Sequence, residues 1–403
     1  MHKIAFRNIF RQKRRSILTA LTMLGGFVLA AVAIGWADGA YNNIINMFTR
    51  NRLGHIQVHA AGYLDKPSLY KNIEQVDHIG ALIENVEGVE AWSPRLYSVG
   101  LASVGEKSAA VRIIGVDPER ENIATHFDKK VVEGDTLSRH PTKEVLMGKG
   151  LVKRLRTRVG AEVVIVSQAA DGSLANDLYQ LKGIVESGDE AEDSMAFYLH
   201  LAEAQELLVM EGRVHEMVII VKKLNQVRTL SREIRQVIRD PDLVVSPWQE
   251  FAKSFYTAMK ADKMGNWIMI FIIILIVAIG VLNTVLMSVL ERQREYGLLK
   301  ALGTRPGQVL GLVLYEITFL AIFSIAMGSG LAYCANSWLA AHGITLSEPF
   351  SYGGMVFHTM YGEINIRSFV IPALAVLFTT LLVGFLPALK AARTAPAKTM
   401  RAM

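Results

Sequence analysis

Four uncharged or nearly uncharged apolar runs constrain the fold of this chain more than any other feature. About 20 helical residues, at about 1.5 Å each, are needed to cross about 30 Å of hydrocarbon. Runs of that length occupy residues 16–37, 264–290, 306–333 and 368–389, and Glu316 is the ionisable residue within them. The first run follows basic residues, but it is longer than the 7 to 15 apolar residues that are typical of a signal peptide. We therefore expect an α-helical membrane protein with four transmembrane helices.

Residues 38–263, between the first two runs, are numerous enough to form a domain with its own core. Short β-branched segments such as 56–59 and 111–116 predict strands, and Val227–Ile238 has the apolar spacing of a helix. Asp171-Gly172 is typical of a hairpin tip. We expect a large mixed α/β extracytoplasmic domain between helices 1 and 2, and a continuous helix from Trp248 into the second span.

The distribution of Lys and Arg predicts the orientation. Six lie in residues 1–15, four in 291–305 and four in 390–403, whereas the 334–367 loop has one. Because cytoplasmic flanks carry the excess of basic residues, both termini and the 291–305 turn are predicted to be cytoplasmic, in the inner membrane. The domain at 38–263 holds 28 basic and 32 acidic residues. The pI of 9.2 therefore reflects topology and gives no indication of nucleic-acid binding.

The N-terminal residues 1–15 have an apolar stripe that includes Phe6 and Phe10 and a separate basic stripe. This pattern predicts an amphipathic helix on the cytoplasmic membrane surface. Simple basic flanking of the first helix is the alternative. The basic residues proposed to contact the membrane surface are Arg7, Arg11, Arg14 and Arg15.

Catalytic and metal-binding motifs are weak. GLASVGEKS, residues 100–108, resembles a phosphate-binding loop, but Glu106 separates the glycine from the lysine and would repel phosphate. His215-Glu216 starts a zinc-protease pattern that Ile219 breaks, and His55 and His59 have no evident third ligand. We expect no enzyme activity, no metal and no cofactor in this chain. Cys334 is the single cysteine, so no internal disulfide forms.

The turn between the second and third runs, LERQREYGLLKALGT (290–304), is rich in strong helix formers, and Gly303 is placed to end the helix. Tyr296, Leu299 and Leu302 are predicted to share an apolar stripe. A short amphipathic helix between two spans suits a groove on a partner protein, which we expect to be an ATPase. The predicted contact residues are Glu291, Arg292, Arg294, Glu295, Tyr296, Gly297, Leu299, Lys300, Leu302 and Gly303.

This segment resembles the cytoplasmic coupling segment of ABC transporter permeases of the FtsX, MacB and LolC/LolE type. Similar strings follow in order along most of the chain. They are RNIFRQKRRSILT (7–19), GVDPERE (115–121), MGKGLVKRLRTRVGAEV (147–163), LKGIVESGDEAEDSMAFYLHLAEAQELL (181–208) and FLPALKAARTAPAKTMR (385–401).

The resemblance implies a dimer, with a second copy or a paralogue, bound to two cytoplasmic ATPase subunits that hold ATP and Mg²⁺. It also implies mechanical transmission to the outer domain. The outer-domain strings are most similar to LolC and LolE, which extract lipoproteins from the inner membrane. The LolC hairpin that recruits a periplasmic carrier contains proline, whereas residues 166–181 here do not. A carrier, an adaptor or a lipoprotein is therefore an open choice of periplasmic partner.

Two polar residues fall within the apolar runs. Glu316 matches a glutamate in the third span of the family, and we expect it to pair within the bundle or with a basic residue of the 291–305 turn, since an unpaired carboxylate is costly in lipid. A glutamate that reaches back to the membrane surface is the alternative. Asn283 is expected to hold helices together.

Three functions remain open at this stage. The first is extraction or export of a lipoprotein, lipid or other amphiphile. The second is FtsX-like signalling that activates a periplasmic protein and moves nothing. The third is MacB-like drug or peptide efflux with an adaptor.

Overall fold

The computed structural model describes residues 13–352 and 355–393. The predicted surface helix at 1–15, with Arg7 and Arg11, lies mostly outside the described residues. The chain forms two compact units. We call Met1–Asn43, Met259–Leu346 and Thr359–Met403 the helical bundle, and Ile44–Ala258 with Ser347–His358 the α/β domain.

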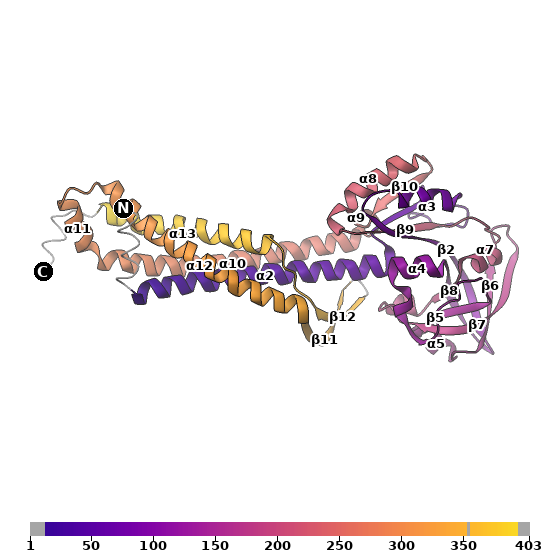
Figure 1. The fold of residues 1–403 in the computed structure, drawn as a ribbon. Coiled ribbons are helices and arrows are strands. Elements are labelled where there is room, and N and C mark those ends of the chain that lie inside the picture. The colour runs from indigo at the N-terminus through magenta and orange to yellow at the C-terminus, as the bar shows by residue number, and fades with distance from the viewer. Residues whose placement is uncertain (1–12, 353–354, 394–403) are drawn as a thin grey trace. The chain divides into compact units, whose positions relative to one another are not determined.

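Four long helices lie side by side in the bundle (Figure 1). They are α2 (Lys13–Phe48), α10 (Lys253–Glu291), α12 (Pro306–His342) and α13 (Arg367–Arg393), joined by the short α11 (Gln293–Ala301). All four are long and apolar enough to cross a membrane, as the apolar runs predicted. Each helix is longer than its apolar run and includes polar residues at one or both ends.

Small residues allow the bundle helices to approach one another closely. A Cβ on Gly26 of α2 would lie 1.9 Å from Val277 Cγ2 of α10, so only glycine fits there. Between α2 and α12, Ser324 donates to the Ala20 carbonyl at 3.0 Å, and buried Asn336 donates to the Ala31 carbonyl at 3.4 Å. Small residues and interhelical hydrogen bonds replace the hydrophobic driving force that is absent in lipid.

Two expectations for the bundle's connections were wrong. The helix expected from Trp248 is interrupted at Ala252 (φ −105°, ψ 45°), which separates α9 (Trp248–Phe251) from α10. The 334–367 loop is shorter than expected because α12 continues to His342, and it contains the strands β11 (Ile344–Tyr352) and β12 (Met355–Met360). Both strands of this two-stranded sheet are edge strands, which tolerate the proline that β11 contains.

The α/β domain is built on a 10-stranded sheet in which β6 (Glu162–Gln168) pairs with β2 and β7. The other strands follow in the order β10 (Leu243–Pro247), β1 (Ile56–Ala60), β9 (Glu216–Val221), β2 (Val89–Val104), β3 (Lys107–Val116), β8 (Ala196–His200), β5 (Glu144–Gly148), β7 (Leu174–Val185) and β4 (Val131–Gly134). Pairs β3–β8 and β5–β7 are parallel and the others are antiparallel. The β6–β7 hairpin turns at Asp171-Gly172, as predicted, with Gly172 at φ +86°.

Helices cover the sheet. They are α3 (Val76–Glu84), α4 (Pro118–Thr125), α5 (Lys149–Leu155), α6 (Glu190–Asp193), α7 (Leu201–Leu208) and α8 (Val227–Ile238), with 3₁₀ turns at Phe127–Lys130 and Leu224–Gln226. In the main core, Val111 and Ile113 of β3 pack with apolar side chains of α5 and α7. Arg112, which lies between them, is exposed. This alternation has the two-residue period that is typical of a half-buried strand.

The GVDPERE string connects β3 to α4, and each of its key residues has a structural role. The Asp117 side chain caps α4 by accepting from the Glu119 and Arg120 amides, and Pro118 takes the first turn, where no amide donor is needed. Glu121 is thereby directed into the domain, where its carboxylate binds the buried Arg95 guanidinium at 2.6 Å. Ser93 and Thr125 also donate to this carboxylate, each at 2.7 Å.

Further buried charges hold the π-helical segment Thr49–Leu53, which directly follows α2. Arg52 pairs with Asp189 and with Glu192. Arg95 donates to the Arg52 carbonyl and Lys130 to the Asn51 carbonyl. Arg52, Arg95 and Lys130 border a cavity of about 60 Å³. The segment after α2 is therefore fixed to several elements of the α/β domain.

The pKa values of two carboxylates beside Arg95 are shifted in opposite directions. Burial would raise the pKa of Glu121, but the paired guanidinium overrides this and lowers it to about 2. Glu216 lies farther from Arg95, at 3.8 Å, and burial raises its pKa to about 7. The folded protein thus holds a proton on Glu216 at pH values where the unfolded chain has lost it.

Glu216→Gln should therefore flatten the pH dependence of stability. Between pH about 4.5 and about 7 the wild-type free energy of unfolding falls as pH rises, at most by about 1.4 kcal/mol per pH unit from this group, because the native state binds more protons. Hydrogen exchange of the β9 amides in the full-length protein, followed across this pH range, measures the free energy of unfolding. The exposed Glu162→Gln is the control and should keep the wild-type slope. An unchanged slope in Glu216→Gln would contradict the assignment.

Candidate functional site

The turn between α10 and α12 folds into the short helix α11 instead of an irregular loop. Arg292 separates α10 from α11, and Gly303 ends α11 with φ +95°. The Gly303 amide donates to the Lys300 carbonyl and the Thr304 amide to the Leu299 carbonyl, both at 3.0 Å. This is a Schellman cap, which favours glycine at its left-handed position, so the predicted role of Gly303 in ending the helix is confirmed.

An ion pair joins α11 to α12. Arg292 Nη1 lies 3.0 Å from Glu316 Oε2, and Arg292 Nε lies 2.9 Å from Glu295 Oε2. The Arg292 side chain is 7% exposed and that of Glu316 12%. The predicted pairing of Glu316 with a basic residue of the turn is confirmed. A charge this well buried needs its partner, because the energetic cost of an isolated ion in an apolar setting is several kcal/mol.

Other contacts fix the rest of the site. Arg15, at the start of α2, pairs with Glu291 at the end of α10. Lys300 donates to the Ala392 carbonyl of α13 at 2.7 Å. Helix α11 and the helix ends around it are thus connected to all four long helices. Arg15, predicted to face the membrane surface, instead links two helices, whereas Arg14 is exposed.

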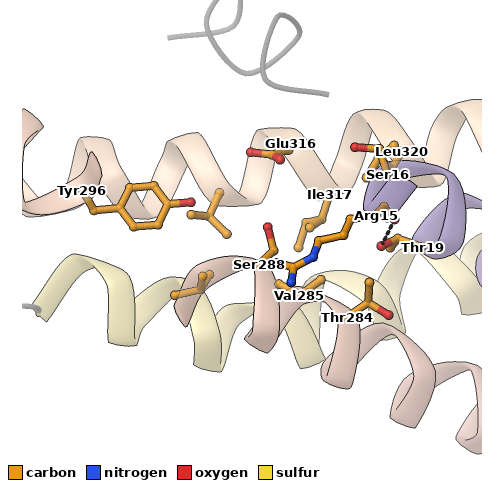
Figure 2. A pocket seen from close by; sticks show the side chains of 12 residues that line it. Arg15, Ser16, Thr19, Thr284, Val285, Ser288, Tyr296, Glu316, Ile317 and Leu320 are labelled. Atoms are coloured by element: carbon orange, nitrogen blue, oxygen red, sulfur yellow. Dashed lines mark hydrogen bonds between the residues drawn. The ribbon is translucent and has the colours of Figure 1, made fainter. Parts of the chain in front are cut away.

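A cavity of about 30 Å³ lies beside these ion pairs. Figure 2 shows that α2, α10, α11 and α12 all contribute to its lining, and that the Arg15 side chain extends toward the helix that carries Val285 and Ser288. Its lining mixes charged, hydroxyl and apolar side chains, among them Arg15, Glu316 and Ser288. The cavity is large enough for a water molecule.

Tyr296 departs from the sequence prediction. Its ring was expected on the outward apolar stripe of the coupling segment, but it is 1% exposed and packs in the bundle core with Val289 and Val313. Burial raises the pKa of its hydroxyl to about 12, so the group stays neutral. Gly297 is buried beside it, and Leu299 is partly buried against the same core.

The apolar surface that α11 exposes consists of Leu298, which sequence analysis did not select, and Leu302. Their side chains are 58% and 77% exposed. Arg294 is also exposed. Leu298 was missed because the short helix carries apolar residues on both sides, and the side that packs inward is decided by Arg292 and Tyr296.

Asn283 lies on α10 away from these contacts. Its side chain is exposed, and within the described part of the chain it has no hydrogen-bond partner. The expected role in packing helices of one chain is therefore not seen.

Two family models match the chain. One, described as the MacB-like periplasmic core domain, matches residues 16–237, more than half of the chain. The other, described as the FtsX-like permease C-terminal domain, matches residues 267–396, which include α11 and its partners. The chain belongs to the FtsX-like and MacB-like ABC transporter permeases.

Similar curated proteins agree with this family. The permease is 22% identical to the lipoprotein-releasing system transmembrane protein LolC of Neisseria meningitidis, over 81% of this chain and 79% of that one. It is 23% identical to an uncharacterized ABC transporter permease of Methanocaldococcus jannaschii, over 98% and 96%. It is 24% identical to the macrolide export ATP-binding/permease protein MacB of Campylobacter jejuni, over 98% of this permease and 60% of that protein.

Among solved structures, the periplasmic region of MacB from Actinobacillus actinomycetemcomitans aligns with 49% of this permease and 91% of that chain. The sequence identity is 12% and the TM-score 0.37. Membership in the family rests on the sequence matches.

The Arg292–Glu316 pair gives a testable prediction. Glu316→Gln leaves the buried guanidinium without its main partner and should cost about 3–5 kcal/mol of stability. The double variant Arg292→Met/Glu316→Leu removes both charges and should cost less than the single variant. Thermal unfolding of the purified permease in detergent measures both. A double variant that is less stable than Glu316→Gln would contradict the pairing as the main role of these residues.

Proposed function

We propose that this permease transmits ATP-driven movement of a separate cytoplasmic ABC ATPase dimer to its α/β domain on the other side of the membrane. The observation that carries the proposal is that α11 is held firmly against the bundle. Arg292, Tyr296 and Lys300 attach it to the bundle, while Leu298 and Leu302 remain exposed.

The contacts that hold α11 determine how a push from a partner would be transmitted. A flexible loop would absorb a push from a partner, whereas α11 is tied to α12 by an ion pair and to α13 by a hydrogen bond. Movement of α11 therefore displaces the bundle helices with it. The exposed leucines suit an apolar groove on the ATPase, and the exposed Arg294 suits an acidic rim. ATP and Mg²⁺ bind to the partner in this proposal.

The proposed substrate is a lipoprotein, a lipid or another amphiphile in the inner membrane. Support comes from the similarity to LolC, which is named as part of a lipoprotein-releasing system, and from the match to the MacB-like domain. Such a substrate would enter sideways from the outer leaflet, between two permease copies, and leave along the α/β domain. Both termini and α11 lie in the cytoplasm in this arrangement.

Leu298→Asp with Leu302→Asp should abolish co-purification of the ATPase and leave membrane insertion unchanged, because both side chains are exposed and neither supports the bundle. The matched control is Leu174→Asp, which changes a leucine that is 73% exposed in the α/β domain and should retain the ATPase. Pull-down from detergent extracts measures how much ATPase each variant retains. Full retention of the ATPase by the double variant would reject α11 as the contact.

A second measurement tests the substrate class. A photoreactive residue in place of Trp267 on α10, which is 49% exposed, should cross-link a radiolabelled lipoprotein in reconstituted vesicles, and ATP should reduce the cross-link when the ATPase is present. The same probe at Leu382 of α13, which is 60% exposed, is the control for random contact in the bilayer. Equal labelling at both sites, insensitive to ATP, would favour a signalling or efflux role.

A further inference from the structure

The cavity of about 60 Å³ in the α/β domain lies on the side of the sheet that faces away from the main core. Val111 and Ile113 of β3 pack into that core, whereas Arg112, Ile114 and Val116, which alternate with them, line the cavity. The cavity has room for several water molecules, and therefore for a small ion.

Six charged side chains line this cavity, and their charges do not cancel. They are Arg52, Arg95, Arg112, Lys130, Glu121 and Glu192. Glu121 binds Arg95 at 2.6 Å, and Glu192 binds Arg52 at 2.5 Å. Both carboxylates of the lining are therefore taken up by two of the four cations. The other two cations, Arg112 and Lys130, have no carboxylate of the lining to offset them.

Lys130 is the inner of these two cations. Its Nζ donates to the Asn51 carbonyl and lies 5.6 Å from the centre of the Phe127 ring. An ammonium group has three N–H donors, so two remain for another acceptor. Among the residues that the structure describes, no carboxylate oxygen lies within 4 Å of this Nζ. Burial lowers the pKa of Lys130 to about 8, so the group still carries its charge at neutral pH.

Arg112 is the outer cation, and its side chain is exposed at the rim of the cavity. In the described part of the chain it forms neither an ion pair nor a side-chain hydrogen bond. A guanidinium offers five N–H donors in a planar fork that fits two oxygens of one oxyanion. The cavity thus has unused donors and uncompensated positive charge at both its inner end and its rim.

We infer that this cavity binds the phosphate group of a small molecule or of a lipid headgroup, held by Lys130 from inside and by Arg112 from the rim. A phosphate monoester carries a charge of about −1.5 to −2 and three acceptor oxygens, which matches two cations better than a single carboxylate does. A pocket of about 540 Å³ shares Asn51, Lys130 and Ser187 with the cavity, so the rest of a larger phosphate ester has space beside it.

A bound phosphate should also stabilise the α/β domain. Repulsion from Arg95 and Arg52 disfavours the charged form of Lys130, and an anion between these groups would offset that repulsion. Lys130 and Arg95 both donate to carbonyls of the segment that follows α2, so the bound anion would strengthen the hold on this segment. The proposed function does not assign this site and does not depend on it.

Thermal unfolding of the full-length permease in detergent tests the site with inorganic phosphate. At constant ionic strength, phosphate should raise the unfolding temperature until the site is saturated, because a ligand of the folded state stabilises it. Lys130→Met should abolish the saturable rise. The matched control is Lys222→Met, which changes an exposed lysine of the same domain that does not line the cavity. Phosphate also stabilises proteins by exclusion from their surface, and that part persists in every variant.

Arg112→Gln tests the site without any change in a buried group. Because the side chain is exposed, the variant should fold as the wild type does, and its Kd for phosphate in a calorimetric titration should rise about 10- to 100-fold. A wild-type permease without a saturable response to phosphate would overturn the inference, and so would an equal response in wild type and Lys130→Met.

The source of the phosphate is distinguished in the same titration. Short-chain dihexanoyl phosphatidic acid is compared with inorganic phosphate below the concentration at which the lipid forms micelles. Tighter binding of the lipid, lost in Lys130→Met, supports a headgroup site, and tighter binding of inorganic phosphate supports a site for a small phosphate compound. Co-purification of the ATPase is measured on the same variants and should not change, so failure of this site is separate from failure of the proposed function.

Discussion

The buried pair of Arg292 and Glu316 determines how the turn between α10 and α12 of this permease is organised. Glu316 lies within an apolar helix, where a lone carboxylate is too costly to keep. The cation that pairs with it, Arg292, follows α10 directly, and α11 lies against α12 with this pair in place. That position buries Tyr296 and leaves Leu298 and Leu302 exposed. The exposed apolar surface of this turn is therefore a consequence of an electrostatic requirement inside the bundle.

The α/β domain uses paired arginines in a comparable way. The segment Thr49–Leu53, directly after α2, is held by the Arg52 pairs with Asp189 and Glu192, and by Arg95, whose guanidinium also binds Glu121. Paired buried charges contribute little net stability, but removal of one partner is costly. In each unit, ion pairs thus hold the segment next to a long helix.

The features that could be predicted from the sequence are those that depend on hydrophobicity and local chemistry. The four helices followed from the length of the apolar runs, the Glu316 pair from the cost of a carboxylate in lipid, and the Gly303 cap from its position. Tyr296 was misplaced because periodicity in a nine-residue helix shows which residues share a side, not which side is buried. The side is chosen by long-range contacts with α12 and the bundle core. The β11–β12 sheet and the break at Ala252 were likewise not predicted by local patterns.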